Sequence, residues 1–173
     1  LSLVPTGPDD AARAHLQRGA ELAWALREAG QVTYPPVDEV VRSLDLAAVR
    51  EPVLLVEPAD NIGGGAPGDG TGILRSLLAH AVPRSLVVLA DAQAVEAFSD
   101  AEPGTTRAVA IGGRGSHLDA GPVPVEATLV SRSDGRFTLE DAQSHMASMG
   151  GVNVDMGPCA VVRTGGVTIL LTS

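Results

Sequence analysis

DNIGGGAPGDGT, at residues 60–71, lies between the apolar run PVLLVE at 52–57 and a helical pattern at 72–80. A continuous apolar run of this length is typical of a buried parallel strand. The order of strand, glycine-rich loop and helix is that of a βα unit, and such folds place ligands at the carboxyl edge of the sheet. The stretch therefore predicts an α/β fold with a functional loop after a strand at 52–57.

Regular elements are predicted on both sides of this unit. Downstream, strands are expected at 85–90 and 107–111, with a helix at 91–99 between them. This alternation predicts βα units with parallel strands. Upstream, apolar residues at helical spacing predict helices at 9–29 and 37–46, the first capped by its opening aspartates.

Beyond residue 113 the apolar residues follow the period of strands. Residues 123–131 alternate, Asp134-Gly135 is a turn signal, and 136–139 is expected to return from it. Runs at 159–163 and 167–171 flank Gly165-Gly166, which predicts another hairpin. This part of the chain is therefore expected to be mainly antiparallel.

We expect one domain over residues 1–173 with three parts: leading helices at 1–50, an α/β part at 51–113, and a mainly antiparallel β part at 114–173. The fold class is α/β, with βα units and a partly parallel sheet followed by an antiparallel β extension. The chain stops at Ser173 directly after a predicted strand, which we interpret as an end inside a longer protein.

Composition excludes several classes of function. The net charge is −9, which repels nucleic acid and anionic lipid. All 12 basic residues are Arg, so neither a Schiff-base lysine nor a phosphate-loop lysine is available. The single Cys159 is expected to be a small buried residue. No apolar run approaches the ~20 residues that span a bilayer, so we expect a cytoplasmic protein without a membrane or nucleic-acid partner.

The loop at 60–71 does not fit a phosphate cradle. The P-loop pattern places a lysine where this chain has Asp69. The dinucleotide pattern G-x-G-x-x-G fits Gly63, Gly65 and Gly68, but Asp60 and Asp69 flank it and would repel a pyrophosphate. The two carboxylates could instead bind a cation or orient a water. Alternatively, Asp60 caps the loop through its own backbone and Asp69 caps the following helix.

A metal site elsewhere on the chain is a further alternative. His117 and Asp119 are neighbours that could supply two ligands, and His145 and Asp155 could join them only through the fold. Zinc sites in proteins usually need three or four converging ligands. No G-x-S-x-G pattern for a serine nucleophile is present.

The loop is similar to the signature of the MlrC-like metallopeptidase family, which usually reads DNPGGGAPGDGT. Ile62 replaces the usual proline, and both aspartates remain. The resemblance covers nearly the whole chain. Other matching segments follow in the same order: 24–27, 91–95, 112–113, 155–157, 165–167 and 171–173.

The resemblance implies a two-domain zinc hydrolase that cuts peptides, with linearised microcystin as the best-known substrate. Its zinc ligands and general base belong to an N-terminal domain outside this sequence, so the resemblance places no metal ligand on this chain. The implied partners are that domain and a peptide substrate. An isolated C-terminal domain would be inactive. A homo-oligomer is an open alternative, because a severed domain often exposes an apolar face.

The resemblance also implies that the loop lies at the domain junction. There Asp60 and Asp69 would orient substrate or stabilise charge near the metal. The implied binding loop consists of Asn61, Gly63, Gly64, Gly65, Gly68, Gly70 and Thr71. The rival hypothesis is a non-catalytic α/β domain that binds a small molecule or acts as a scaffold.

Overall fold

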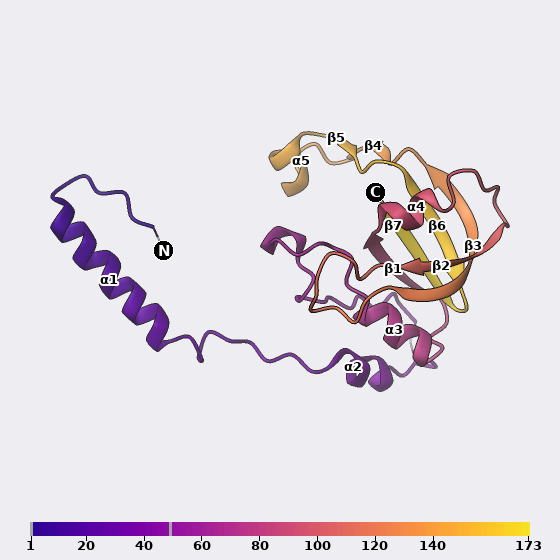
Figure 1. Ribbon diagram of the computed structural model, residues 1–173, viewed down its shortest axis with the longest axis horizontal. Coiled ribbons are helices and arrows are strands. Elements are labelled where there is room, and N and C mark those ends of the chain that lie inside the picture. The colour runs from indigo at the N-terminus through magenta and orange to yellow at the C-terminus, as the bar shows by residue number, and fades with distance from the viewer. Residues whose placement is uncertain (1, 49) are drawn as a thin grey trace. The chain divides into compact units, whose positions relative to one another are not determined.

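The computed structural model describes residues 2–48 and 50–173 (Figure 1). It divides into two compact units, Leu1–Pro36 and Val37–Ser173. The first unit contains one long helix, α1, at Asp9–Ala25, so the predicted helix exists but ends earlier than expected. No residue of α1 is buried, and Pro8 is its N-cap without a side-chain bond. The predicted capping by the aspartates was wrong, because Asp9 and Asp10 lie inside the first turn.

The second unit is built on a five-stranded sheet with the order β1-β7-β6-β3-β2 (Figure 1). Its edge strands β1 and β2 are Ser85–Ala90 and Thr106–Ile111. The three strands between them are β3 at Val123–Ser133, β6 at Cys159–Thr164 and β7 at Val167–Thr172. Only β1 and β7 run parallel, and every other neighbouring pair is antiparallel. The predicted fold class, α/β with a partly parallel sheet, is therefore confirmed.

The helices of this unit are α2 at Val37–Ser43, α3 at Gly72–Ala79 and α4 at Ala92–Glu96. Leu74 of α3 and Phe98, just after α4, are almost completely buried. They belong to one apolar core with alternate residues of β7, of which Ile169 and Leu171 are fully buried. Full burial of side chains of this size stabilises the fold by about 1.5–3 kcal/mol each. The intervening β7 residues are only half-buried, so the core lies on one face of the sheet.

Two predictions about strands were wrong. Residues 52–57 form no strand, and Leu54 is 86% exposed. The strand at 107–111 corresponds to β2, but β2 pairs antiparallel with β3. Parallel neighbours need a long crossover connection, usually a helix. The segment between β2 and β3 contains only turns and bends, which suits an antiparallel return.

The antiparallel part contains one feature that the sequence pattern missed. The predicted hairpin at 159–171 is confirmed as β6 and β7. The segment expected to return to 123–131 is β4 at Arg136–Thr138, but it pairs with β5 at Asn153–Asp155 in a separate two-stranded sheet. Between them lies α5, His145–Gly150, which was not predicted.

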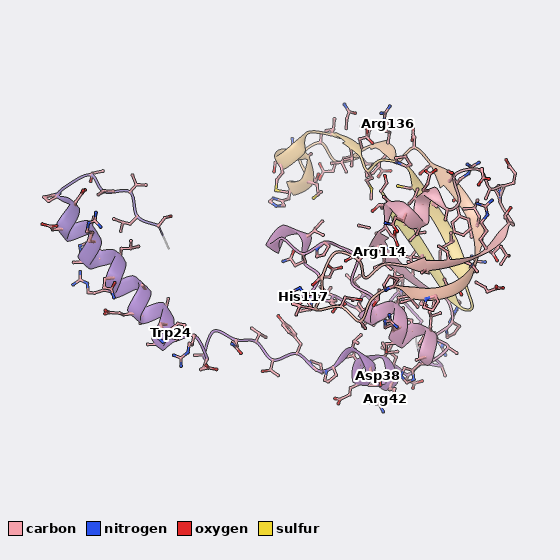
Figure 2. All side chains as sticks on the ribbon, in the orientation of Figure 1. Trp24, Asp38, Arg42, Arg114, His117 and Arg136 are labelled. Carbon is pink, nitrogen blue, oxygen red and sulfur yellow. The ribbon has the colours of Figure 1, made fainter. Side chains whose placement is uncertain are left out.

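Asp38 connects α2 to α3, and Figure 2 shows it beside Arg42 on α2. Its Oδ1 lies 2.6 Å from the Nε2 atom of His80 and accepts a 3.2 Å bond from the Ser76 hydroxyl. Arg42 lies 3.2 Å from the other oxygen. The hydrogen bond with His80 is the largest cause that holds the pKa of Asp38 below its usual value; burial opposes it, and the Ser76 bond and the interactions with His80 and Arg42 also lower the pKa.

Asp38 should stabilise the fold in a pH-dependent way. Because its folded pKa lies below the unfolded value of about 4, the contribution is complete above that value and is lost as the pH falls through the lowered pKa. Asp38→Asn should therefore lower the urea midpoint slightly at about pH 5, and this difference should disappear at about pH 2. Glu39→Gln, a neighbouring exposed carboxyl, is the control. A difference that stays constant with pH would contradict the assignment.

Candidate functional site

Asp60 closes the glycine-rich loop, residues 60–71, onto itself. Its Oδ1 accepts a 2.8 Å bond from the Gly68 amide, and its Oδ2 accepts a 2.7 Å bond from the Gly70 amide. At the loop tip, Asn61 accepts a 3.0 Å side-chain bond from the Gly63 amide and begins a short 3₁₀ helix, η1, at Ile62–Gly64. Asp60 therefore caps the loop, as the structural alternative predicted, but through its carboxylate and not through its own backbone.

Asp69 connects the glycine-rich loop to a second loop, residues 112–122, which follows β2. The residue is 6% exposed, and its Oδ2 accepts bonds of 2.6 and 2.7 Å from the amides of Arg114 and Gly115. Its carbonyl accepts a 2.7 Å bond from the Gly113 amide. The prediction that Asp69 caps the following helix was wrong, because the N-cap of α3 is Thr71 and no side chain bonds there.

Thr71 and Asp119 form a second connection between the two loops. Thr71 is fully buried, and its amide and hydroxyl donate bonds of 2.8 and 2.7 Å to the two carboxylate oxygens of Asp119. Asp119 also accepts a 2.8 Å bond from the Gly121 amide. Burial raises the pKa of Asp119, but these bonds and the charge of Arg75 outweigh it and leave the pKa below its usual value. The carboxylate is therefore held in its charged form.

Asp91, just after β1, connects the start of α4 to the second loop. Its Oδ1 accepts a 3.0 Å bond from the Ala94 amide as the N-cap of α4, and its Oδ2 accepts a 2.7 Å bond from Gly112. The Arg114 guanidinium contacts the same carboxylate, and it also donates a 2.5 Å bond to the Ala110 carbonyl. Sequence reasoning missed this role, although an aspartate between a strand and a helix is a capping signal.

The two loops lie side by side beyond the ends of β1 and β2 (Figure 1). Gly115 is packed so closely that an added Cβ would lie 2.4 Å from the Cβ of Pro67. The pair presents exposed side chains to solvent, among them Asn61, Ile62 and Leu118. His117 is also exposed on the second loop, where Figure 2 labels it. The predicted binding residues thus lie in a doubly connected pair of loops, where Asn61 and the glycines at 63–65 are exposed and Thr71 is buried.

Glu57 adds a titratable group beside the loops. Burial raises the pKa of this half-buried carboxyl, and the nearby charges of Asp60 and Asp119 raise it further. Carboxyl groups with raised pKa values are suited to proton transfer. Sequence reasoning did not select Glu57, because its surroundings are set by a loop from another part of the chain.

The carboxylates of this surface do not fit a zinc site. Asp60 and Asp119 use both oxygens as hydrogen-bond acceptors, and Asp69 uses one for two amides. Across residues 2–48 and 50–173, no group of three or more His, Cys, Asp or Glu side chains could hold a metal ion. Asp155 is bonded instead to Arg136 and to the Gly157 amide.

One comparison with known proteins identifies a family, and another finds a solved structure of similar fold. Residues 55–173 match the family described as MlrC C-terminus. The fold also resembles the crystal structure of a "Putative metallopeptidase" from Mesorhizobium sp. BNC1, with a TM-score of 0.72 and 27% sequence identity. That similarity covers 88% of this chain and 30% of the Mesorhizobium protein. No curated protein matches the chain. Because the family match extends over most of its length, the chain belongs to the MlrC C-terminus family.

Proposed function

We propose that this chain is the C-terminal domain of a zinc-dependent metallopeptidase that hydrolyses peptide bonds in small or linearised peptides. The family match and the name of the Mesorhizobium protein support the metallopeptidase assignment. The chain spans only 30% of that protein, so a separate domain that carries the metal ligands accords with the comparison. In this proposal the chain forms one wall of the cleft and the metal belongs to the other domain.

The hydrogen bonds that join the two loops, residues 60–71 and 112–122, are the observation that carries the proposal. Asp60 and Asp69 fix the glycine-rich loop through bonds of 2.6–2.8 Å to backbone amides. A wall held this rigidly can orient a peptide without reorganising during the reaction. We therefore assign both aspartates as positioning residues. The glycine-rich residues at 63–65 shape the loop tip.

Groups other than Asp60 and Asp69 would make the direct contacts to a peptide on this surface. The amides of Gly63, Gly64 and Gly65 already donate to atoms of Asn61 and Ile62. The exposed side chains at the tip are therefore better placed to touch substrate than the loop amides. Glu57, with its raised pKa, would hold or release a proton at the edge of this surface.

We also propose a cytoplasmic location. Within the described residues, no helix is both long and apolar enough to cross a membrane. The acidic composition, with a net charge of −9, gives the surface no attraction for anionic lipid.

Zinc content and hydrolysis test the proposal together. The chain alone, stripped and reloaded with zinc, should retain no stoichiometric metal and should not cleave a short linear peptide. The full-length product of its gene should retain stoichiometric zinc and should cleave the peptide. Stoichiometric zinc on the chain alone would overturn the proposal, because His117, Asp119 and their neighbours would then form a site of their own.

In the full-length protein, Asp60→Ala should lower kcat by roughly 10–100-fold with zinc retained, because the loop would lose its closing acceptor. Glu140→Ala, which removes an exposed carboxylate, is the control. Unchanged kinetics for Asp60→Ala would contradict the positioning role.

A further inference from the structure

Residues 52–57 form a segment whose backbone groups find no backbone partner within the described residues. The segment belongs to no helix or strand. Among the described residues, none of its amide or carbonyl groups takes part in a backbone hydrogen bond. Its sequence, PVLLVE, has the composition of a strand. A segment of this kind is a ready template for pairing with another strand.

From residue 54 to residue 57 the side chains alternate between exposed and half-buried, as in a strand, whereas Val53 is 53% exposed. Leu55 packs against the core of the unit, and Glu57 is half-buried. On the other side, Leu54 is 86% and Val56 is 79% exposed. A single exposed leucine is ordinary, but neighbouring apolar side chains on one face of an unpaired segment indicate a surface that is normally covered.

The edge strand β1 exposes apolar side chains as well. β1 pairs only with β7, so its outer edge is open within the described sheet. Leu86 and Val88 are 65% and 53% exposed, and no charged residue or proline protects the strand. Val88 lies beside Leu170 of β7, so the apolar stripe continues onto the face of the sheet opposite the core.

We propose that residues 52–57, with Leu86 and Val88, are the docking surface for the metal-bearing domain. Residues 52–57 then become a β-strand by pairing with an edge strand of that domain. This inference rests on the proposed function for the identity of the occupant. Most of the Mesorhizobium protein lies outside the matched region, which leaves enough polypeptide for a whole domain.

The position of the segment supports this occupant over others. Residue 57 leads within three residues into Asp60, which closes the glycine-rich loop. If an edge strand of the metal-bearing domain pairs with residues 52–57, the two loops at 60–71 and 112–122 would therefore be held beside that domain. A cleft between the two domains requires the loops to lie there.

Hydrogen–deuterium exchange tests the pairing directly. In the chain alone, the amides of 53–57 should exchange near the rate of an unstructured peptide. In the full-length gene product every second amide of the segment should exchange on the order of 100-fold more slowly, because pairing with one neighbouring strand places alternate amides in the ladder. The double variant Leu54→Arg/Val56→Arg should leave the Tm of the chain alone unchanged and should abolish the protection in the full-length protein. The control variant Met146→Arg/Met149→Arg alters two exposed methionines of α5 and should leave this protection unchanged.

Four results would overturn the proposal. Protection in the dilute chain alone would mean that the segment pairs within its own unit. Protection that rises with chain concentration, together with a dimer mass, would assign the surface to a second copy. Fast exchange in the full-length protein would exclude docking there, and a gene product no longer than this chain would remove the occupant.

The failure of the docking surface can be told apart from the failure of the proposed function. Protection in the full-length protein without zinc or hydrolysis would leave the docking surface standing and refute the proposed function. Hydrolysis with fast exchange would refute the docking surface and leave the proposed function standing.

Discussion

Asp69→Ala should lower the free energy of unfolding by about 2–4 kcal/mol, because the partly buried amides of Arg114 and Gly115 lose their shared acceptor. Both bonds are short, at 2.6 and 2.7 Å, and both end on a charged oxygen of a residue that is 6% exposed. In a chain of this length about 1 kcal/mol corresponds to about 2–4 °C, so Tm should fall by roughly 4–16 °C.

Two further variants make the Asp69 measurement specific. Glu140→Ala removes an exposed carboxylate that accepts no hydrogen bond in the described part of the chain, and it should leave Tm nearly unchanged. Asp69→Asn keeps one neutral oxygen that can face both amides, so its loss should be smaller than that of the alanine variant. Scanning calorimetry provides the Tm values. An alanine variant as stable as the Glu140 control would show that Asp69 does not join the loops.

The elements that the sequence predicted correctly are those whose signals are local. The helix α3 follows directly after a loop, and the hairpin of β6 and β7 is marked by Gly165-Gly166 between two apolar runs. The failure at 52–57 has a different cause. An apolar run indicates that a segment is suited to burial on both faces, but it does not say which chain or domain supplies the neighbouring strand. In the described residues that neighbour is missing.

The candidate site also has a part that the sequence could predict and a part that it could not. Asp60 bonds to amides 8 and 10 residues away, so the closing of the loop could be anticipated from the loop itself. Asp69 bonds to Gly115 at a separation of 46 residues, and Thr71 bonds to Asp119 at 48. Those distances are set by where β1 and β2 end in the sheet, and no spacing in the sequence encodes them. The resemblance located the loop but not its partners.

Gly113 lies where the second loop folds tightly back on itself, and Gly113→Ala should therefore be strongly destabilising. Its φ of +64° lies in the left-handed region, which costs a residue with a Cβ about 1–2 kcal/mol. The added Cβ would also lie 2.5 Å from the Asp119 carboxylate and from the Gly121 backbone, and such overpacking costs about 1–3 kcal/mol more. The total expected loss is about 2–5 kcal/mol.

Gly165→Ala separates these two contributions. Gly165 has a similar φ of +54°, but an added Cβ there would meet nothing within 4 Å. Its alanine variant should therefore lose only the backbone part, about 1–2 kcal/mol. Urea unfolding measures both losses, and the excess at Gly113 reports the close packing of the second loop around Asp119. The Thr71 amide, which bonds to Asp119, should also exchange faster in the Gly113 variant and not in the Gly165 variant. Equal losses and equal exchange would mean that the second loop does not pack tightly around Asp119, and the rigid wall on which the proposed cleft depends would not exist.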